Sequence, residues 1–246
     1  MMWRGLTGAD VLDIWEAGHG LSSSARALLV LAAVDPEAPP EDVARLPLGA
    51  RDRALLAVRA ATLGNRLEAF AHCPACASPL EFPVDIGALL ADEPVDAPAT
   101  PLAVEAGGFR LSVRAPDSRD QAAAEGCADP AAAEARLLAA CVSAVDGQGY
   151  PVSVEALPAT ARAAAAEAIL ALDPLTEVSF DLACPACGCD WSLALDVPGF
   201  LWEEIGQQAR RLVGEVALLA RAYGWSERDI LAMSPARRQN YLAWAG

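Results

Sequence analysis

Apolar residues in the first third of the chain recur with the spacing of amphipathic helices. Residues 7–18, 21–34 and 49–64 each place their apolar side chains on one face. Thr7 or Asp10 is a suitable N-cap for the first helix, and glycine ends the first and third. We therefore expect a helical N-terminal segment over residues 1–65.

The period changes from helical to alternating in two later stretches, residues 66–91 and 175–198. Each has the pattern of a strand, a Cys-x-x-Cys turn and a second strand. In the first stretch, Leu80, Phe82 and Val84 lie on one face of the expected strand, and Glu81 and Asp85 lie on the other. Both turns have the sequence Cys-Pro-Ala-Cys with an aromatic residue shortly before it, so the stretches repeat one local unit.

Residues 92–174 separate the two units. They begin with an acidic Pro/Ala linker at 92–101, followed by a short hairpin that turns at Gly107 and Gly108. Alanine-rich helices are expected near residues 117–125, 130–143 and 158–171. Residues 199–246 are helical again, and Ser226 and Ser234 are suitable caps for two short helices.

The paired cysteines carry the clearest chemistry. A structural Zn²⁺ site needs four ligands in a tetrahedron, and Cys73, Cys76, Cys184 and Cys187 make one complete set if the two units pair in space. The alternatives are a thioredoxin-like redox pair or four unligated thiols. A redox pair belongs at the start of a helix, whereas both turns here lie between strands, and this favours structural zinc.

Three thiols remain. Cys189 could replace one of the four ligands, although the matched spacing favours the original set; Cys127 and Cys141 are expected to be ordinary buried thiols. The expected fold class is therefore α+β and mostly helical, with a split zinc ribbon of two Cys-x-x-Cys β-knuckles. The expected divisions are an N-terminal helical segment (1–65), the first knuckle (66–91), the linker and helical insert (92–174), the second knuckle (175–198) and C-terminal helices (199–246).

Charge is distributed unevenly along the 246 residues. The net charge is −15, and residues 81–200 carry 19 acids and 5 arginines, whereas residues 201–246 carry 5 acids and 6 arginines. An acidic middle repels phosphate backbones, so nucleic-acid binding is disfavoured. The chain has no apolar run near the roughly 20 residues of a membrane span and no signal-peptide pattern. We expect a cytoplasmic protein with reduced thiols and no membrane partner.

The sequence offers little for catalysis. It has two histidines: His72 is expected at the surface beside Cys73, and His19 in a loop after the first helix. Neither lies near an evident nucleophile, and no phosphate-binding glycine motif is present. We expect no enzyme and no small-molecule substrate.

The C-terminal segment concentrates aromatic and arginine residues. Three of six tryptophans and two of three tyrosines fall within residues 199–246. Such a composition is typical of protein–protein contact surfaces, although the same aromatics can instead close a helical hairpin. A DNA-recognition helix is the other alternative, but residues 226–233 carry two acids and one arginine, which suits DNA poorly. The candidate partner-binding residues are Trp202, Tyr223, Trp225, Arg237, Arg238 and Tyr241.

Several stretches carry a resemblance to a known family. They are LDIWEAG, ARLPLGARDRALLAVRAATLGNRLEAFAHCPAC, the DP at 173–174, LACPACG with VPGFLWEEI, and LLARAYGWSERDILAMSPARRQNYL. These resemble the baseplate hub assembly chaperones of T-even-type contractile-tail phages, which also occur in gene clusters of phage-like contractile injection systems. The family offers no catalytic residues, and its cysteine pairs are not uniform, so the zinc prediction depends on the spacing in this chain.

The resemblance implies a non-catalytic assembly factor that binds baseplate hub or spike proteins. A structural baseplate component retained in the particle is the first alternative. A zinc-ribbon or helix-turn-helix regulator that binds nucleic acid is the second.

Overall fold

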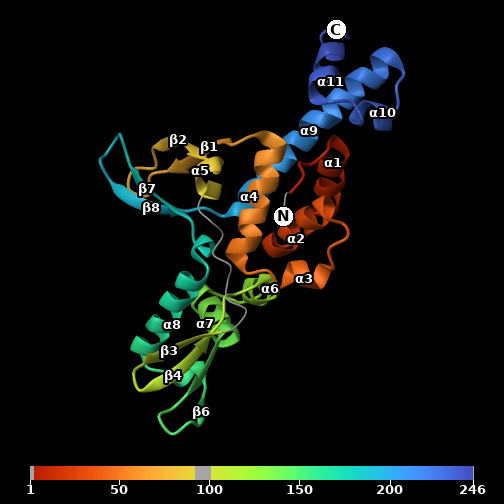
Figure 1. The fold of residues 1–246 in the computed structure, drawn as a ribbon. Coiled ribbons are helices and arrows are strands. Elements are labelled where there is room, and N and C mark those ends of the chain that lie inside the picture. The colour runs from red at the N-terminus through yellow and green to blue at the C-terminus, as the bar shows by residue number, and fades with distance from the viewer. Residues whose placement is uncertain (1–2, 92–100, 246) are drawn as a thin grey trace.

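The computed structural model describes residues 3–91 and 101–245 and consists of a central helical body with three extensions (Figure 1). One extension holds the two cysteine ribbons, the second holds the segment inserted between them, and the third is the C-terminal tip. Apart from its last residue, the expected linker at 92–101 lies outside the described residues. Within the described ranges, no helix combines the length and the apolar character needed to cross a bilayer.

The body contains the N-terminal helices and the first half of a long C-terminal helix. The Thr7 hydroxyl accepts a hydrogen bond from the backbone N–H of Asp10, and the Asp10 carboxylate accepts one from the N–H of Thr7. This reciprocal cap starts the first helix and Gly18 ends it, as the sequence predicts. The helices of the body are α1 (Gly8–Ala17), α2 (Ser23–Val34), α3 (Pro40–Ala44), α4 (Leu48–Leu63) and α9 (Val197–Tyr223).

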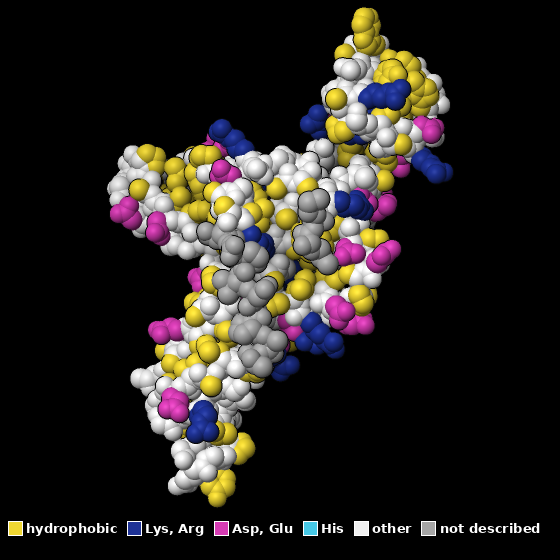
Figure 2. All heavy atoms as spheres, in the orientation of Figure 1, with side chains coloured by type: hydrophobic (Ala, Val, Ile, Leu, Met, Phe, Trp, Pro, Cys, Tyr) yellow, Lys and Arg dark blue, Asp and Glu magenta, His cyan; other side chains and the backbone are white. Residues whose placement is uncertain are grey.

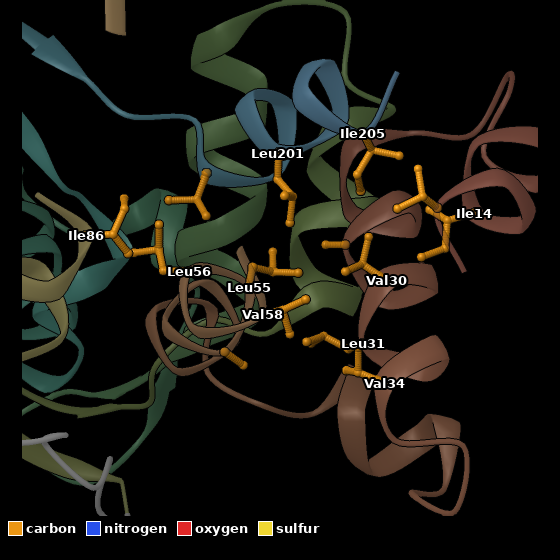
Figure 3. Close-up of a cluster of buried hydrophobic side chains, with 14 of the residues drawn as sticks. Ile14, Val30, Leu31, Val34, Leu55, Leu56, Val58, Ile86, Leu201 and Ile205 are labelled. Carbon is orange, nitrogen blue, oxygen red and sulfur yellow. The ribbon is translucent and has the colours of Figure 1, made fainter. Parts of the chain in front are cut away.

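These helices share one hydrophobic core, although α9 is far from the others in sequence. Leu31, Leu55 and Val58 are fully buried, and Leu201 and Ile205 of α9 belong to the same cluster (Figure 3). Burial of one such side chain contributes about 1.5–3 kcal/mol. The start of α9 is therefore an integral part of the body.

The two cysteine ribbons are separate two-stranded antiparallel sheets on one side of the body. They are β1 (Arg66–His72) with β2 (Pro79–Asp85), and β7 (Ser179–Ala183) with β8 (Asp190–Ala194). Leu67, Ala69 and Ala71 of β1 are buried while their neighbours are exposed, which confirms the predicted alternation. The predicted first knuckle also contains a short helix, α5 (Ile86–Ala91), where Ile86 reaches the body core.

The insert forms its own small core between a sheet and helices. Its four strands lie in the antiparallel order β3-β4-β5-β6, and the sheet extends the predicted hairpin, which turns at Gly107 and Gly108 with positive φ. The expected helix at 130–143 is wrong at its end: it stops at Cys141, and Val142 begins a strand because Val142 and Ala144 pair with β4 and are buried. The elements are β3 (Leu102–Ala106), β4 (Phe109–Val113), α6 (Ser118–Glu125), α7 (Pro130–Cys141), β5 (Val142–Val145), β6 (Pro151–Val152) and α8 (Ala159–Leu172), with short 3₁₀ turns at Val154–Ala156 and Pro174–Thr176.

The insert joins the body at the first turn of α4, through polar contacts. The backbone N–H of Gly49 donates to the Asp173 carboxylate at 2.7 Å, and a Cβ atom at Gly49 would lie 2.0 Å from an oxygen of that carboxylate. Arg51 is 1% exposed, and its Nε donates to Asp52 at 2.7 Å while its NH1 nitrogen donates to Gln121 of α6. Burial raises the pKa of Asp52 to about 6, although Arg51 beside it acts in the opposite direction.

The tip consists of the last turns of α9 with α10 (Glu227–Leu231) and α11 (Pro235–Leu242). Gly224 ends α9 in the left-handed region with φ of 71°, a conformation that favours glycine. Ser226 and Ser234 cap the two short helices, as predicted. The tip extends from the body at the far end of α9 (Figure 1).

Candidate metal centre and C-terminal tip

The two Cys-x-x-Cys turns have the same backbone geometry. In the first, Ala77 N–H donates to Cys73 C=O at 2.9 Å; in the second, Gly188 N–H donates to Cys184 C=O at 2.9 Å. Ala77 and Gly188 both have positive φ, at 58° and 73°. Each turn therefore directs its two sulfurs toward one side of its ribbon.

The four cysteine sulfurs of the two ribbons converge at one point. All four ligand atoms lie within 4.8 Å of one another, with Cys73 Sγ 3.7 Å from Cys187 Sγ and Cys76 Sγ 3.6 Å from Cys184 Sγ. A tetrahedron with metal–sulfur bonds of about 2.3 Å has edges of about 3.8 Å. The described sulfurs thus fit a single four-coordinate ion, and a set of four thiolates suits zinc or iron.

The two turns differ in how they set the thiol pKa values. The pKa values of Cys73 and Cys76 in the first turn are lowered. The backbone N–H at Cys189 lowers the pKa of Cys187, but the neighbouring sulfurs outweigh it and raise this pKa to about 12. Thiolates are the forms that bind metal. The Ser78 hydroxyl lies 3.3 Å from Cys76 Sγ and lowers the pKa of Cys76 to about 6. Cys73 and Cys184 are buried, whereas Cys76 and Cys187 are exposed. All seven cysteines are free, and the short sulfur–sulfur distances run between the ribbons.

Cys189 occupies the position that Ser78 has in the other turn. Cys73 N–H donates to Ser78 C=O at 3.0 Å, and Cys184 N–H donates to Cys189 C=O at 2.9 Å. Cys189 is therefore the residue after the turn, and it lies outside the convergent set of four. This geometry supports the four ligands that the spacing favours.

The remaining thiols and histidines lie elsewhere. Cys141 is buried, as expected, but Cys127 is only half-buried because it lies just beyond the end of α6. His72 is exposed and packs edge-on against Phe70, and His19 is exposed beside Trp15 and Trp202.

Three of the predicted partner-binding residues form an aromatic cluster in the tip. The rings of Tyr223 and Trp225 stack with centroids 4.5 Å apart, and Tyr241 meets both of them edge-on. Arg237 lies 5.9 Å from the ring of Tyr241, and Trp244 is 85% exposed. Figure 2 shows the hydrophobic side chains that gather on the tip. The cluster therefore closes the tip and also presents apolar surface.

Arg238 differs from its neighbour Arg237. It is 4% exposed, and its Nε donates to the Glu215 carboxylate at 3.0 Å. Arg211 and Gln239 also donate to Glu215. Arg238 is therefore a structural residue of the tip, because it neutralises a buried carboxylate, whereas Arg237 is exposed.

Trp202 lies apart from the other candidates. It belongs to the second turn of α9, inside the body, where the Arg26 guanidinium sits 4.3 Å over its ring. Its ring also contacts Gly18, where a Cβ atom would lie 2.4 Å from it. The structure thus separates Trp202 from the tip residues with which the sequence groups it.

Glu215 is the residue of the tip that sequence reasoning missed. The signal was present, because Glu215 follows Leu212 by three residues and precedes Leu219 by four, on the buried stripe of α9. A carboxylate within an apolar stripe requires a buried cationic partner. This signal would have pointed to an arginine on a neighbouring helix.

A comparison with known proteins places the chain in a family. The family described as T4 bacteriophage base plate protein has a sequence model that matches residues 30–201. That range includes α4, both ribbons and the insert, and it ends before the tip. No curated protein matches the chain, and no solved structure matches it.

Proposed function

Because the chain belongs to the family of T4 bacteriophage base plate proteins, we propose that it is a non-catalytic assembly factor for a contractile-tail baseplate. It acts in the cytoplasm by binding hub or spike proteins and leaves before the particle is complete. The observation that carries this proposal is the family match over residues 30–201. The resemblance of the C-terminal stretch to hub assembly chaperones adds the specific role.

In this proposal the tip is the partner-binding surface. Trp244 is 85% exposed and Arg237 lies on the outer side of α11, next to an aromatic cluster that already holds the tip in shape. The tip also borders a groove of about 780 Å³ against α1, lined by Gly8, Leu231 and Met233 among others. Preformed aromatic surface loses little side-chain entropy on binding, which favours a stable contact.

The four clustered cysteines bind a structural zinc ion in this proposal. The sulfur spacing and the duplicated turn geometry support a tetrahedral site, and zinc is the ion that such closed Cys₄ sites in β-knuckles commonly hold. The ion would fix the two ribbons to each other. Its role is structural, since all four coordination positions are filled by protein.

Mass spectrometry of purified assembly intermediates and finished particles tests the assembly role. We expect the protein with hub intermediates and not in finished particles. Stoichiometric copies in finished particles would instead establish a retained structural component. Normal particle assembly in cells lacking the protein would reject both roles.

Variants of the tip test the partner surface. Trp244→Ala and Arg237→Ala, each with unchanged helicity by circular dichroism, should lose co-purification with hub or spike proteins. Tyr150→Ser is the matched control, because Tyr150 is also an exposed aromatic but lies on the insert. If both tip variants still retain every partner, the tip is not the docking surface.

A further inference from the structure

A groove of about 680 Å³ lies between the two ribbons and the start of α9, away from the tip. Four of the chain's five phenylalanines line it: Phe70, Phe82, Phe180 and Phe200. Phe82 and Phe180 contact each other across the two ribbons, with centroids 5.8 Å apart. The groove therefore exists only while the ribbons are held side by side.

Phe70 does not contribute to the core. It lies on the outward face of β1 and is 54% exposed, whereas Phe82, Phe180 and Phe200 pack partly against the body. The register pairs Phe82 with the buried Ala69, so Phe70 lies on the opposite face of its ribbon from Phe82 and meets the groove at the edge of β1, where a paired segment would lie beside it. Phe82, Phe180 and Phe200 form the apolar surface of the groove itself, and such a surface marks a contact site.

The strands beside the groove have unpaired edges. Among the described residues, β1 pairs with β2 alone and β8 pairs with β7 alone. Residues 66–70 of β1 line the groove in an unbroken run, as do residues 193–196 at the end of β8 and just beyond it. Free backbone donors and acceptors along such an edge can pair with an extended segment of another chain.

The charge around the groove is negative. Four acids and two arginines line it: Glu68, Asp196, Glu203 and Glu204 against Arg59 and Arg66. Both arginines that line the groove are already paired, Arg59 with Glu204 at 2.7 Å and Arg66 with Glu68 at 2.5 Å. Glu203, also in the lining, has no cationic partner among the described residues. Figure 2 shows acidic side chains at the end of the arm that holds the ribbons.

We infer that this aromatic groove binds an extended segment of a partner protein in which apolar side chains alternate with arginine or lysine. The phenylalanines receive the apolar side chains, the strand edges pair with the backbone, and the acidic rim attracts the basic side chains. The inference rests on the proposed function for the partner's presence in an assembly, but the groove is separate from the tip. A second copy of this acidic chain is a poor occupant, because the rims would repel each other.

Fluorescence anisotropy with the full chain tests the groove. The probe is a nine-residue peptide that alternates arginine with valine around a central phenylalanine, and the control probe has glutamate in place of each arginine. We expect the arginine peptide to bind at least about tenfold more tightly than the glutamate peptide, with affinity falling as salt rises. Phe70→Ser and Glu203→Arg should each weaken binding by about tenfold, and Tyr150→Ser should leave it unchanged.

Circular dichroism and metal content of each variant show that the fold is intact. Equal affinity of the parent and Phe70→Ser for the arginine peptide would overturn the inference, as would equal affinity of the parent for both peptides. A parent dimer in light scattering that Phe70→Ser converts to a monomer would also overturn it, because the groove would then join two copies. Peptide binding combined with normal particle assembly in the absence of the protein would reject the proposed function alone.

Discussion

The cysteine ribbons and the C-terminal tip are both small units at the edge of the body, but they are held together in different ways. The ribbons bring together Cys76 and Cys184, which are 108 residues apart in sequence. The tip is closed by contacts between Glu215 and Arg238, 23 residues apart, and by a local aromatic cluster. The ribbons therefore meet through contacts distant in sequence, at four sulfurs spaced for one metal ion, whereas the tip is held by one buried carboxylate and its nearby partners.

The difference also explains how well each unit could be predicted. Tetrahedral metal coordination uses few residue types at few characteristic spacings. The cysteine pattern alone therefore predicts a candidate metal site. An aromatic and arginine-rich composition does not distinguish a contact residue from a structural one. Arg237 and Arg238 are neighbours of the same type, and one is exposed while the other is buried.

Removal of one ligand should have the largest effect. We expect Cys184→Ser to lose its metal and to lower the free energy of unfolding by more than about 4 kcal/mol, because loss of a structural metal is among the most destabilising changes. Denaturant titration measures the change. Cys189→Ser is the matched control from the same ribbon and should keep both metal and stability. Equal stability of the two variants would remove the structural role of the site.

Loss of the buried arginine in the tip should come next. Arg238→Ala leaves Glu215 buried without its buried cationic partner. This should lower the free energy of unfolding by about 3 kcal/mol, the lower end for a broken buried pair, because Arg211 and Gln239 still donate to Glu215. Arg237→Ala should change stability by less than about 0.5 kcal/mol. Hydrogen exchange should show the loss confined to α10, α11 and the end of α9. Similar exchange in both variants would contradict the proposed difference between the arginines.

The pH dependence of the unfolding free energy should differ between the body and the ribbons, with a smaller effect than either substitution above. The pKa of Asp52 is about 6 in the folded protein and about 4 in the unfolded chain. Between these values the folded state binds more protons, so the unfolding free energy from Asp52 falls as pH rises from about 4 to 6, by roughly 2 kcal/mol. Metal-bound thiolates act in the opposite direction, because acid releases the metal.

The substitution Asp52→Asn removes the contribution of Asp52 and leaves that of the metal-bound thiolates. Urea titrations between pH 4 and 7 should show that the variant lacks the fall in stability that the parent has over this interval. A parent and variant with parallel profiles would show that Asp52 does not titrate in this window.

Local structure was predictable wherever a cap, a turn or a period specified it. Three helices begin at the N-caps that the sequence indicates, Thr7, Ser226 and Ser234, and the first helix ends at Gly18. The strand at Val142 was not predictable, because it follows an alanine-rich helix without a turn signal and depends on pairing with β4. The contact between Gly49 and Asp173 could not be derived either, since neither residue signals a partner 124 residues away.

In the candidate site, spacing alone favoured four cysteines whose sulfurs the fold brings together, and it left Cys189 open as a replacement. The location of Trp202 inside the body did not, because its helix continues from the core into the tip without a break. The aromatic groove could not be predicted from the sequence for a similar reason. Its phenylalanines are distributed over two ribbons and α9, and only the fold brings them together.

The most direct test of the account is the metal content of freshly purified, untagged protein, measured by inductively coupled plasma mass spectrometry. We expect one zinc ion per chain in the parent and in Cys189→Ser, and almost none in Cys184→Ser. A parent that contains well under one zinc per chain, or that contains iron instead, would contradict a structural zinc ion joining the two ribbons.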